Sequence, residues 1–599
     1  MSKVLHFGAV VSLVSLMDLS AQSPRQTMRP VLRGIHAAVT SMKPEATQAA
    51  AQILRSGGNA FDAVVAGQAV LGIVDSPMNG VGSDAVALIW DARAGRVVSL
   101  NAEGTAPALA TIDWYKQHHG GTLPSSDTLL SGTVPGMVDA WYLMLDRWGT
   151  LTFADVLAPA IEIAERGFPM SERLSRLIST SQKLRQYPTS MKVYCPGGHC
   201  PAPGEIWKNP DLARTLRTLV DAERRSAHLG RRQALRAARD CFYKGDLAHA
   251  MAAFSEANGG LFRHGDFAAY SAKFEEPVSI DYHGWHVYKN ASSTQGPAEL
   301  FALNILESYD LKQLGLNTPA YIHTSAEAIK LAMADRDKYL GDADFIQIPF
   351  EGLLSKDYAR LRRQLIDPAH ASLDYRPGVP ENFIPGMQPL DRPADFKLAG
   401  DADHDGDTSY IAVVDSAGNA VSLTPSLHSG FGTGVVMGDL GFIFNCRGDY
   451  YSLLPGHANA LAPGKRPRST LQSTLVTRAG SLAMLMGSPG GDDQCMRTMQ
   501  TFLNMVEFDM NVQQAIEAPR WTTRAFPSSP FPHTMYPADL GVEDRIPPAV
   551  RRQLSAKGHK VRSYPPWSMG ANGAIVLDPS TGVRSAGADP RCDAYALAW

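Results

Sequence analysis

Several features of common protein classes are missing from this sequence. Its 56 Lys and Arg residues are balanced by 59 Asp and Glu residues, so it lacks the basic excess of proteins that bind nucleic acid or anionic membranes. Six cysteines in 599 residues are too few for a small disulfide scaffold. No segment holds 18 uninterrupted apolar residues, so we expect no transmembrane helix.

Familiar catalytic motifs are missing as well. We find no G-x-x-x-x-G-K-[ST] phosphate loop, no G-x-S-x-G elbow and no H-E-x-x-H metal motif. What is present is an ordinary globular composition, with 44% apolar and 19% charged residues. The length suits one very large core or roughly three or four average domains. These observations favour a large soluble enzyme.

The first residues resemble a short signal peptide. Lys3 precedes an apolar run from Val4 to Met17, and small residues end at Ala21. The alternatives are a plain N-terminal extension or a true start at Met28. We treat 1–28 as a leader or signal peptide and expect a periplasmic or secreted protein, with a cytoplasmic location as the alternative.

Two cysteines are close enough to form a disulfide. Cys195 and Cys200 flank a loop with two glycines, and a disulfide there would suit export. A zinc site would need a second ligand pair, and none has the usual spacing. The other four cysteines are scattered along the chain and are interpreted as small buried apolar groups.

The pattern along the chain predicts one α+β domain. Helices are expected at 47–56, after the capping residue Asn59, across 208–257 and from Thr318-Pro319 onward. Hairpins are expected at 86–100, 410–423, 475–486 and 575–585. There is no internal repeat and no long linker. Packed sheets with outer helices fit this order of elements.

The segment from Asp401 to Tyr410 carries the chemistry. Its first half matches the calcium pattern D-x-D-x-D-G, but the twelfth position is Ala412 instead of a bidentate Glu, which disfavours calcium. The other interpretation is that Thr408, at the start of a strand, is a nucleophile. A threonine hydroxyl needs a base, and cleavage before Thr408 would supply its own α-amine, with a pKa of about 7.7–8.0.

A glycine pair further along supports this interpretation. Gly490 and Gly491 follow an apolar strand, and adjacent glycines can aim backbone N–H groups at one point, as an oxyanion hole requires. Taken singly, each feature has a structural alternative. Thr408 could simply favour a strand, and the glycines could form an ordinary turn.

Ordered segments along almost the whole chain support the interpretation of Thr408 as a nucleophile. They are Gly57 to Ala63, Thr105-Ala106-Pro107, Val134-Pro135-Gly136, Leu157 to Ile161, Ala334-Asp335-Arg336, Tyr339 to Asp342, Asp415 to Thr424, Pro463 to Pro467, Gly487 to Gly491, Ala518-Pro519-Arg520 and Asp589-Pro590-Arg591. Together these segments resemble the γ-glutamyltransferase family of N-terminal nucleophile hydrolases.

The resemblance implies a four-layer αββα sandwich and a self-cleaving precursor. Cleavage between Asp407 and Thr408 would leave a large chain, 29–407, and a small chain, 408–599, held together as a heterodimer, with further dimerisation left open. Thr408 would attack a small-molecule amide, the N–H groups of Gly490 and Gly491 would hold the oxyanion, and Ser426 would steady the nucleophile. Water or an amine would release the acyl group, without metal or cofactor.

The substrate clamp departs from the family pattern. Glu103 stands where the family has an Arg for the substrate carboxylate, Tyr450 replaces the Asp that binds the α-amine, and His428 replaces an orienting Asn. Ser469 and Thr470 nearly keep a Ser-Ser pair. Because losing a charge-assisted hydrogen bond costs about 1.5–3 kcal/mol, we expect a substrate other than a standard γ-glutamyl compound.

Other residues resemble the branch with oxamate amidohydrolase and related acylases. The markers are Asn445 to Gly448 and Gly490 to Gln494. Arg447 or Arg468 could replace the lost anchor; the alternative is a surface ion pair, perhaps of Arg447 with Asp449. Three functions stay open: an amidohydrolase or acylase, a γ-glutamyltransferase or glutathione hydrolase with a shifted clamp, and a processing-dead binding relative.

Overall fold

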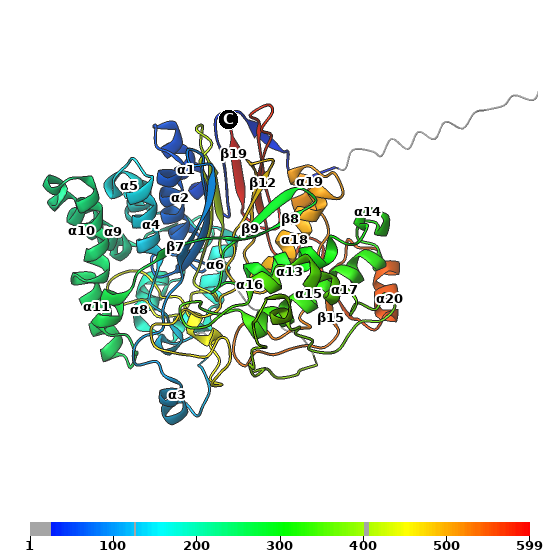
Figure 1. Ribbon diagram of the computed structural model, residues 1–599. Helices are drawn as coiled ribbons and strands as arrows, with labels where there is room; N and C mark the ends of the chain where they lie inside the picture. The colour runs from blue at the N-terminus through cyan, green and yellow to red at the C-terminus, as the bar shows by residue number, and fades with distance from the viewer. Residues whose placement is uncertain (1–25, 125–126, 401–406) are drawn as a thin grey trace, which may run out of the picture.

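Two seven-stranded antiparallel sheets lie face to face in the computed structural model, which describes residues 26–124, 127–400 and 407–599 (Figure 1). The first sheet runs β1 (Leu32–Gly34), β18 (Arg584–Ala588), β17 (Gly573–Leu577), β13 (Ser481–Gly487), β12 (Thr474–Arg478), β9 (Trp285–Lys289), β8 (Val278–Tyr282). The second runs β19 (Tyr595–Ala598), β2 (Ala38–Ser41), β10 (Ile411–Val414), β11 (Ala420–Ser426), β3 (Asp84–Asp91), β4 (Arg96–Ala102), β7 (Lys273–Glu275).

Helices cover the outer face of each sheet (Figure 1). The group on the second sheet holds α1 (Pro44–Arg55), α2 (Ala60–Val74), α4 (Met137–Arg147), α5 (Phe153–Arg166), α9 (Pro210–Arg225), α10 (Arg231–Tyr243) and α11 (Asp246–Ala257). The group on the first sheet holds α13 (Gly296–Leu306), α15 (Pro319–Tyr339), α18 (Asp493–Val506), α19 (Val512–Glu517) and α20 (Pro548–Ala556). The αββα layering is therefore confirmed.

Smaller elements complete the chain. The short helices are α3 (Ile112–His118), α6 (Glu172–Thr180), α7 (Gln182–Arg185), α8 (Pro188–Tyr194), α12 (His264–Ala269), α14 (Leu311–Leu314), α16 (Phe350–Leu353) and α17 (Lys356–Arg363). The remaining strands are β5 (Phe168–Pro169), β6 (Ile206–Trp207), β14 (Trp521–Thr522), β15 (Asp539–Glu543) and β16 (Lys560–Tyr564). No helix in the described ranges is long and apolar enough to cross a membrane.

The local signals explain where elements begin. The side chain of Asn59 accepts from the N–H groups of Phe61 and Asp62, and the Asp62 side chain bonds back to Asn59, which forms the expected capping box of α2. Thr318 caps α15 with Pro319 at its first position, as expected. The 208–257 segment forms three helices, and Cys195 and Cys200 form a disulfide.

Both sheets take strands from both sides of the 407/408 junction. In the second sheet, β10 from the C-terminal part pairs with β2 from the N-terminal part, and β11 pairs with β3. In the first sheet, β12 pairs with β9 in the same way. Cleavage at this junction would leave the two chains joined through the ladders and the core between the sheets.

Candidate active site

Thr408 lies just before β10, at the end of the β10–β11 hairpin. In this hairpin Ile411 is opposite Leu423, so extending the register by three residues places Thr408 opposite Ser426. The side chains do face each other, and the Thr408 hydroxyl donates to Ser426 Oγ at 3.4 Å. Both residues are buried. The register of the hairpin therefore brings the predicted nucleophile and its predicted partner together.

The peptide bond between Asp407 and Thr408 is held on both sides. Ser426 Oγ donates to the carbonyl oxygen of Asp407 at 2.9 Å, and the N–H of Asp407 donates to the carbonyl of His428 at 2.8 Å. The N–H of His428 in turn donates to Ser426 Oγ at 2.7 Å. His428 has φ of 80°, a left-handed conformation that is uncommon outside glycine and that turns its N–H back toward Ser426.

The glycine pair sits where β13 turns into α18. Gly490 has φ of 110° and Gly491 has φ of 52°, conformations that side chains rarely adopt. Gln295 Nε2 pins the turn by donating to the Gly491 carbonyl at 3.0 Å and to the Thr470 carbonyl at 2.8 Å. Gly490 lines the same cavity as Thr408, while Gly491 lies one residue behind it.

The helix after the glycines supplies a contact that the sequence did not assign. Gln494, in the first turn of α18, donates from Nε2 to Thr408 Oγ1 at 3.3 Å. In the sequence, Gln494 stands out only as the last residue of the segment Gly490 to Gln494. Its position in the sequence is the signal that could have identified it. Gln494 comes four residues after Gly490, in the first turn of the helix whose N-terminus points to the same place as the glycine N–H groups.

The six residues predicted to bind substrate form one enclosed cluster. Ser469 Oγ donates to Glu103 Oε1, and Tyr450 and Thr470 are hydrogen-bonded through their hydroxyls at 3.1 Å. The ring of His428 lies 4.2 Å from that of Tyr450. Arg447 completes the group, with its guanidinium 5.3 Å from the Tyr450 ring. All six side chains are buried, and none lines the open cavity at Thr408.

Burial changes the charge state of Glu103. It raises the pKa of this carboxyl to about 8, although the hydroxyls of Ser293 and Ser469 hydrogen-bond to it. Near pH 7 most molecules therefore carry Glu103 protonated, so this carboxyl would not repel a substrate carboxylate by its charge. Its Oε2 atom has no hydrogen-bond partner among the described residues.

Arg447 is not in a surface ion pair. Its guanidinium donates from Nε to Asp84 Oδ2 at 2.7 Å and from Nη2 to Asp84 Oδ1 at 3.2 Å, and both side chains are fully buried. The expected alternative, a surface pair with Asp449, is therefore wrong, because Asp449 pairs with His428 at 2.9 Å instead. Two oxygens of Asp84 already compensate Arg447, which leaves only Nη1 without a hydrogen-bond partner in the described chain.

Arg468 is tied down elsewhere. Its Nη2 lies 3.3 Å from Asp337 Oδ1, and its Nη1 donates to the Asp337 carbonyl at 3.1 Å. Burial lowers the pKa of Arg468 below its usual value, and the neighbouring Arg336 adds to that effect. The arginine therefore serves the packing around α15, which the sequence could not distinguish from a substrate anchor.

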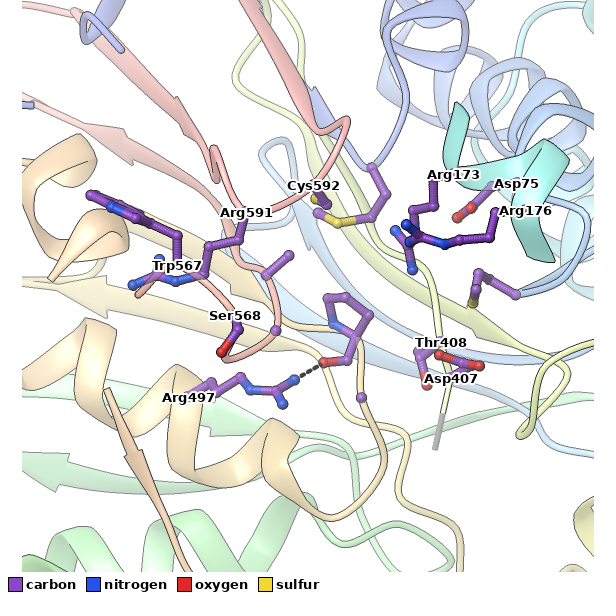
Figure 2. A pocket seen from close by; sticks show the side chains of 16 residues that line it. Asp75, Arg173, Arg176, Asp407, Thr408, Arg497, Trp567, Ser568, Arg591 and Cys592 are labelled. Atoms are coloured by element: carbon purple, nitrogen blue, oxygen red, sulfur yellow. Dashed lines mark hydrogen bonds between the residues drawn. The ribbon is translucent and has the colours of Figure 1, made fainter. Parts of the chain in front are cut away.

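An open cavity of about 310 Å³ lies beside Thr408 and Gly490 (Figure 2). Arg173 and Arg176 enter it from α6, and Trp567 and Ser568 border the opposite side. The cavity gives Thr408 an approach from solvent. It lies apart from the enclosed cluster, so the nucleophile stands between two different environments.

One group of side chains could in principle hold a metal ion. Within the described residues, ligand atoms of His323, Glu327 and His559 lie within 4.8 Å of one another. Glu327 is already bound by Lys330 Nζ at 2.5 Å and by Arg376 Nη2 at 2.9 Å. Two cations beside the only carboxylate disfavour a divalent ion there. The calcium-like segment 401–406 lies outside the described residues.

Comparisons with known proteins agree with this geometry. The sequence model described as Gamma-glutamyltranspeptidase matches residues 46–599. The chain belongs to the γ-glutamyltranspeptidase family. It is 34% identical over 556 residues to the Glutathione hydrolase-like YwrD proenzyme of Bacillus subtilis (strain 168), covering 92% of this chain and 96% of the relative. It is 31% identical over 561 residues to the Oxamate amidohydrolase proenzyme of Klebsiella pneumoniae subsp. pneumoniae, covering 92% and 97%.

A solved structure of the same kind is similar over the full length. The crystal structure of cephalosporin acylase from Bacillus halodurans has a TM-score of 0.83 and 31% sequence identity, covering 98% of this chain and 99% of that chain. As a member of the γ-glutamyltranspeptidase family, this chain is an amide hydrolase or transferase, and its fold is that of the N-terminal nucleophile hydrolases.

Several family segments turn out to support one another. Arg336, from the segment Ala334-Asp335-Arg336, donates to Asp492 Oδ1 at 2.5 Å just after the glycine pair. Arg520 donates to Asp589 Oδ2 at 2.6 Å, which joins two further segments. In this γ-glutamyltranspeptidase-family chain these residues hold the glycine turn and its surroundings in place without lining the cavity at Thr408.

Proposed function

We propose that this protein cuts itself between Asp407 and Thr408 and then acts as an amidohydrolase or acylase with Thr408 as its nucleophile. The observation that carries the proposal is that Ser426 contacts both the attacking hydroxyl and the carbonyl that it attacks. Ser426 Oγ accepts a hydrogen bond from the Thr408 hydroxyl and donates one to the Asp407 carbonyl. A hydroxyl in that position polarises the carbonyl that Thr408 attacks.

The self-cleavage is an acyl shift followed by hydrolysis. Thr408 Oγ1 attacks the carbonyl carbon of Asp407, and the C–N bond breaks as the proton of the hydroxyl passes to the departing nitrogen. The product is an ester of Asp407 on Thr408. Water then adds to the ester carbonyl, which releases Asp407 with a carboxyl group and Thr408 with its hydroxyl and a free α-amine.

The mature enzyme repeats the chemistry on a substrate amide. The α-amine of Thr408 takes the proton of its own hydroxyl, and the oxygen attacks the substrate carbonyl. The N–H groups of Gly490 and Gly491, backed by the N-terminus of α18, hold the oxyanion. The amine leaves with the proton, and water or another amine removes the acyl group from Thr408. Gln494 orients the threonine oxygen.

The acyl group is proposed to differ from a standard γ-glutamyl group. The enclosed cluster has one arginine, Arg447, and Asp84 already binds it with two oxygens. Protonated Glu103 can donate a hydrogen bond but carries no positive charge. A γ-glutamyl group brings both a carboxylate and an ammonium, and this cluster has few groups to offer them. A glutathione hydrolase with a shifted clamp is the second candidate.

The test uses matched amides. Purified protein is offered 4-nitroanilides that share the leaving group and differ in the acyl group, with γ-glutamyl, oxamyl, glutaryl and acetyl members. The proposal expects release from at least one non-glutamyl member at more than about tenfold the γ-glutamyl kcat/KM. A γ-glutamyl preference would support the second candidate. One full-length band on a denaturing gel, with no release from any member, would support the processing-dead binding relative.

Export is part of the proposal. The apolar leader and the Cys195–Cys200 disulfide support an oxidising compartment. Fractionation of cells that express the full chain would find the protein outside the cytoplasm, with residues up to about 21 removed. Retention of an intact leader in the cytoplasmic fraction would contradict this part.

A further inference from the structure

His428 has a backbone conformation that few side chains adopt, and both of its backbone polar groups contact the proposed cleavage site. Its φ is 80°, in the left-handed region. Its N–H donates to Ser426 Oγ at 2.7 Å, and its carbonyl accepts from the N–H of Asp407 at 2.8 Å. A residue other than glycine persists in this conformation only where its surroundings hold it there. The contacts that hold His428 therefore matter for the cleavage.

The side chain of Asp449 holds the ring of His428. His428 Nε2 lies 2.9 Å from the Asp449 carboxylate, and both side chains are buried. Because an ionised carboxylate only accepts hydrogen bonds, Nε2 carries the proton and donates this one. The other ring nitrogen, Nδ1, has no hydrogen-bond partner among the described residues. Hydrogen bonds to charged acceptors are among the stronger ones in proteins, so Asp449 is the polar anchor of this ring.

Asp449 is itself held from the side of the glycine turn. Its carbonyl accepts from the N–H of Phe531 at 2.8 Å, in the loop between β14 and β15. Ser529, in the same loop, donates from its N–H and from its hydroxyl to the two carboxylate oxygens of Asp492, at 2.9 Å and 2.6 Å. Asp492 directly follows Gly491 in the sequence. The loop therefore fixes Asp449 relative to the turn that would hold the oxyanion.

We propose that Asp449 is a positioning residue for self-cleavage of the Asp407–Thr408 bond. The inference rests on the proposed function and adds a residue that acts without touching the reacting atoms. Asp449 keeps the His428 ring in place, the ring keeps the His428 backbone left-handed, and that backbone directs Ser426 Oγ to the Asp407 carbonyl. Without Asp449, we expect the backbone to relax to a negative φ, which turns the His428 N–H away from Ser426.

The rate of two-chain formation tests the role of Asp449. Full-length chains made by cell-free synthesis are followed on denaturing gels from the start of synthesis. Asp449→Ala is expected to be cut at least about tenfold more slowly, because Ser426 is no longer held as a donor. Asp449→Asn should stay within about threefold of wild type, because its amide oxygen can still accept from His428 Nε2. Asp439→Ala, which removes an exposed partner of Lys192, is the matched control and should mature normally.

Two substitutions of His428 separate positioning from direct participation of its ring. His428→Ala removes the ring and keeps a residue that disfavours a positive φ, so it is expected to be as slow as Asp449→Ala. His428→Gly also removes the ring, but glycine adopts φ of 80° readily, so it should be cut at least about fivefold faster than His428→Ala. Adding Asp449→Ala to His428→Gly should then change the rate by less than about twofold.

Three results would overturn the inference while the proposed function stands. They are equal rates for wild type and Asp449→Ala, an Asp449→Asn variant as slow as Asp449→Ala, and equal rates for His428→Gly and His428→Ala. The last would mean that the ring itself takes part in the reaction. If thermal melting shows that Asp449→Ala does not fold, the two His428 variants decide by the same comparison. A wild-type chain that is never cut would contradict the proposed function and the inference together.

Discussion

Ser426 Oγ lies 2.9 Å from the carbonyl oxygen of Asp407 and donates a hydrogen bond to it. The N–H of His428 fixes Ser426 from behind at 2.7 Å, and the N–H of Asp407 is held by the His428 carbonyl. The carbonyl that must be attacked is thus polarised and fixed by two residues at the end of β11. This geometry supports the proposal that the Asp407–Thr408 bond is the one that is cleaved.

Removing this donor should slow maturation. Ser426→Ala leaves the Asp407 carbonyl without its hydrogen bond, and loss of one such donor slows related steps by about 10²–10³-fold. The time course of two-chain formation on denaturing gels measures the effect. Ser416→Ala, in the exposed turn between β10 and β11, is the control and should mature normally. Equal rates for both variants would show that Ser426 does not assist the cleavage.

Gly490 should tolerate no side chain. An alanine there would adopt φ of 110°, and its Cβ would meet the guanidinium of Arg497. The clash would push the turn away from Thr408, so Gly490→Ala is expected to lose at least about 10²-fold in kcat with small change in KM. Gly480→Ala, a hairpin glycine with positive φ and open surroundings, separates backbone strain from damage to the turn. Similar activity in both would contradict an oxyanion role for Gly490.

The free energy of unfolding should depend on pH because of Glu103. The folded chain keeps the Glu103 proton up to about pH 8, whereas its usual pKa is 4.5. The folded state therefore binds more protons between these values, and the free energy of unfolding falls as pH rises through this window, by at most about 1.4 kcal/mol per unit.

Glu103→Gln should remove that dependence. The amide resembles the protonated carboxyl, so the variant gains stability relative to wild type as pH rises from 5 to 8. Urea unfolding at both pH values measures the change, and Glu162→Gln, an exposed residue of α5, is the control. Parallel pH curves for wild type and Glu103→Gln would contradict a raised pKa.

The buried pair of Arg447 and Asp84 should behave as a unit. Arg447→Met leaves the Asp84 carboxylate buried without its partner and is expected to cost about 3–5 kcal/mol of stability. Asp84→Asn combined with Arg447→Met removes both charges and should recover most of that loss. A double-mutant cycle on the free energy of unfolding measures the coupling. Additive losses would mean that the two side chains do not stabilise each other.

Much of the fold and the centre of the site could be predicted. Hairpins with clear turns set the register that pairs Thr408 with Ser426, and the capping box of α2 follows from Asn59 and Asp62. These are local features, and the ordered family segments indicate the fold to which they belong. The position of Gly490 also follows from a local feature. Its turn joins a strand to a helix, and it lines the cavity at Thr408.

The environment of the charged residues could not be predicted. Arg447 finds its partner 363 residues away in sequence, where no spacing rule applies. Glu103 counts as a negative charge in the sequence, but burial holds its proton. Arg173 and Arg176 lie on a short helix without a motif, and only the folded chain brings them to Thr408. Charge and burial are properties of the assembled site.

Intact mass spectrometry tests the central claim most directly. The mass of the purified protein is measured before and after brief exposure to an amide from the panel. The chosen amide is one whose acyl group leaves Thr408 slowly. The account predicts a small chain of residues 408–599 that begins at Thr408 and gains the mass of the acyl group on that residue, and a single uncut chain for Thr408→Ala. A fragment beginning at another residue, cleavage of Thr408→Ala, or an acyl group attached elsewhere would contradict it.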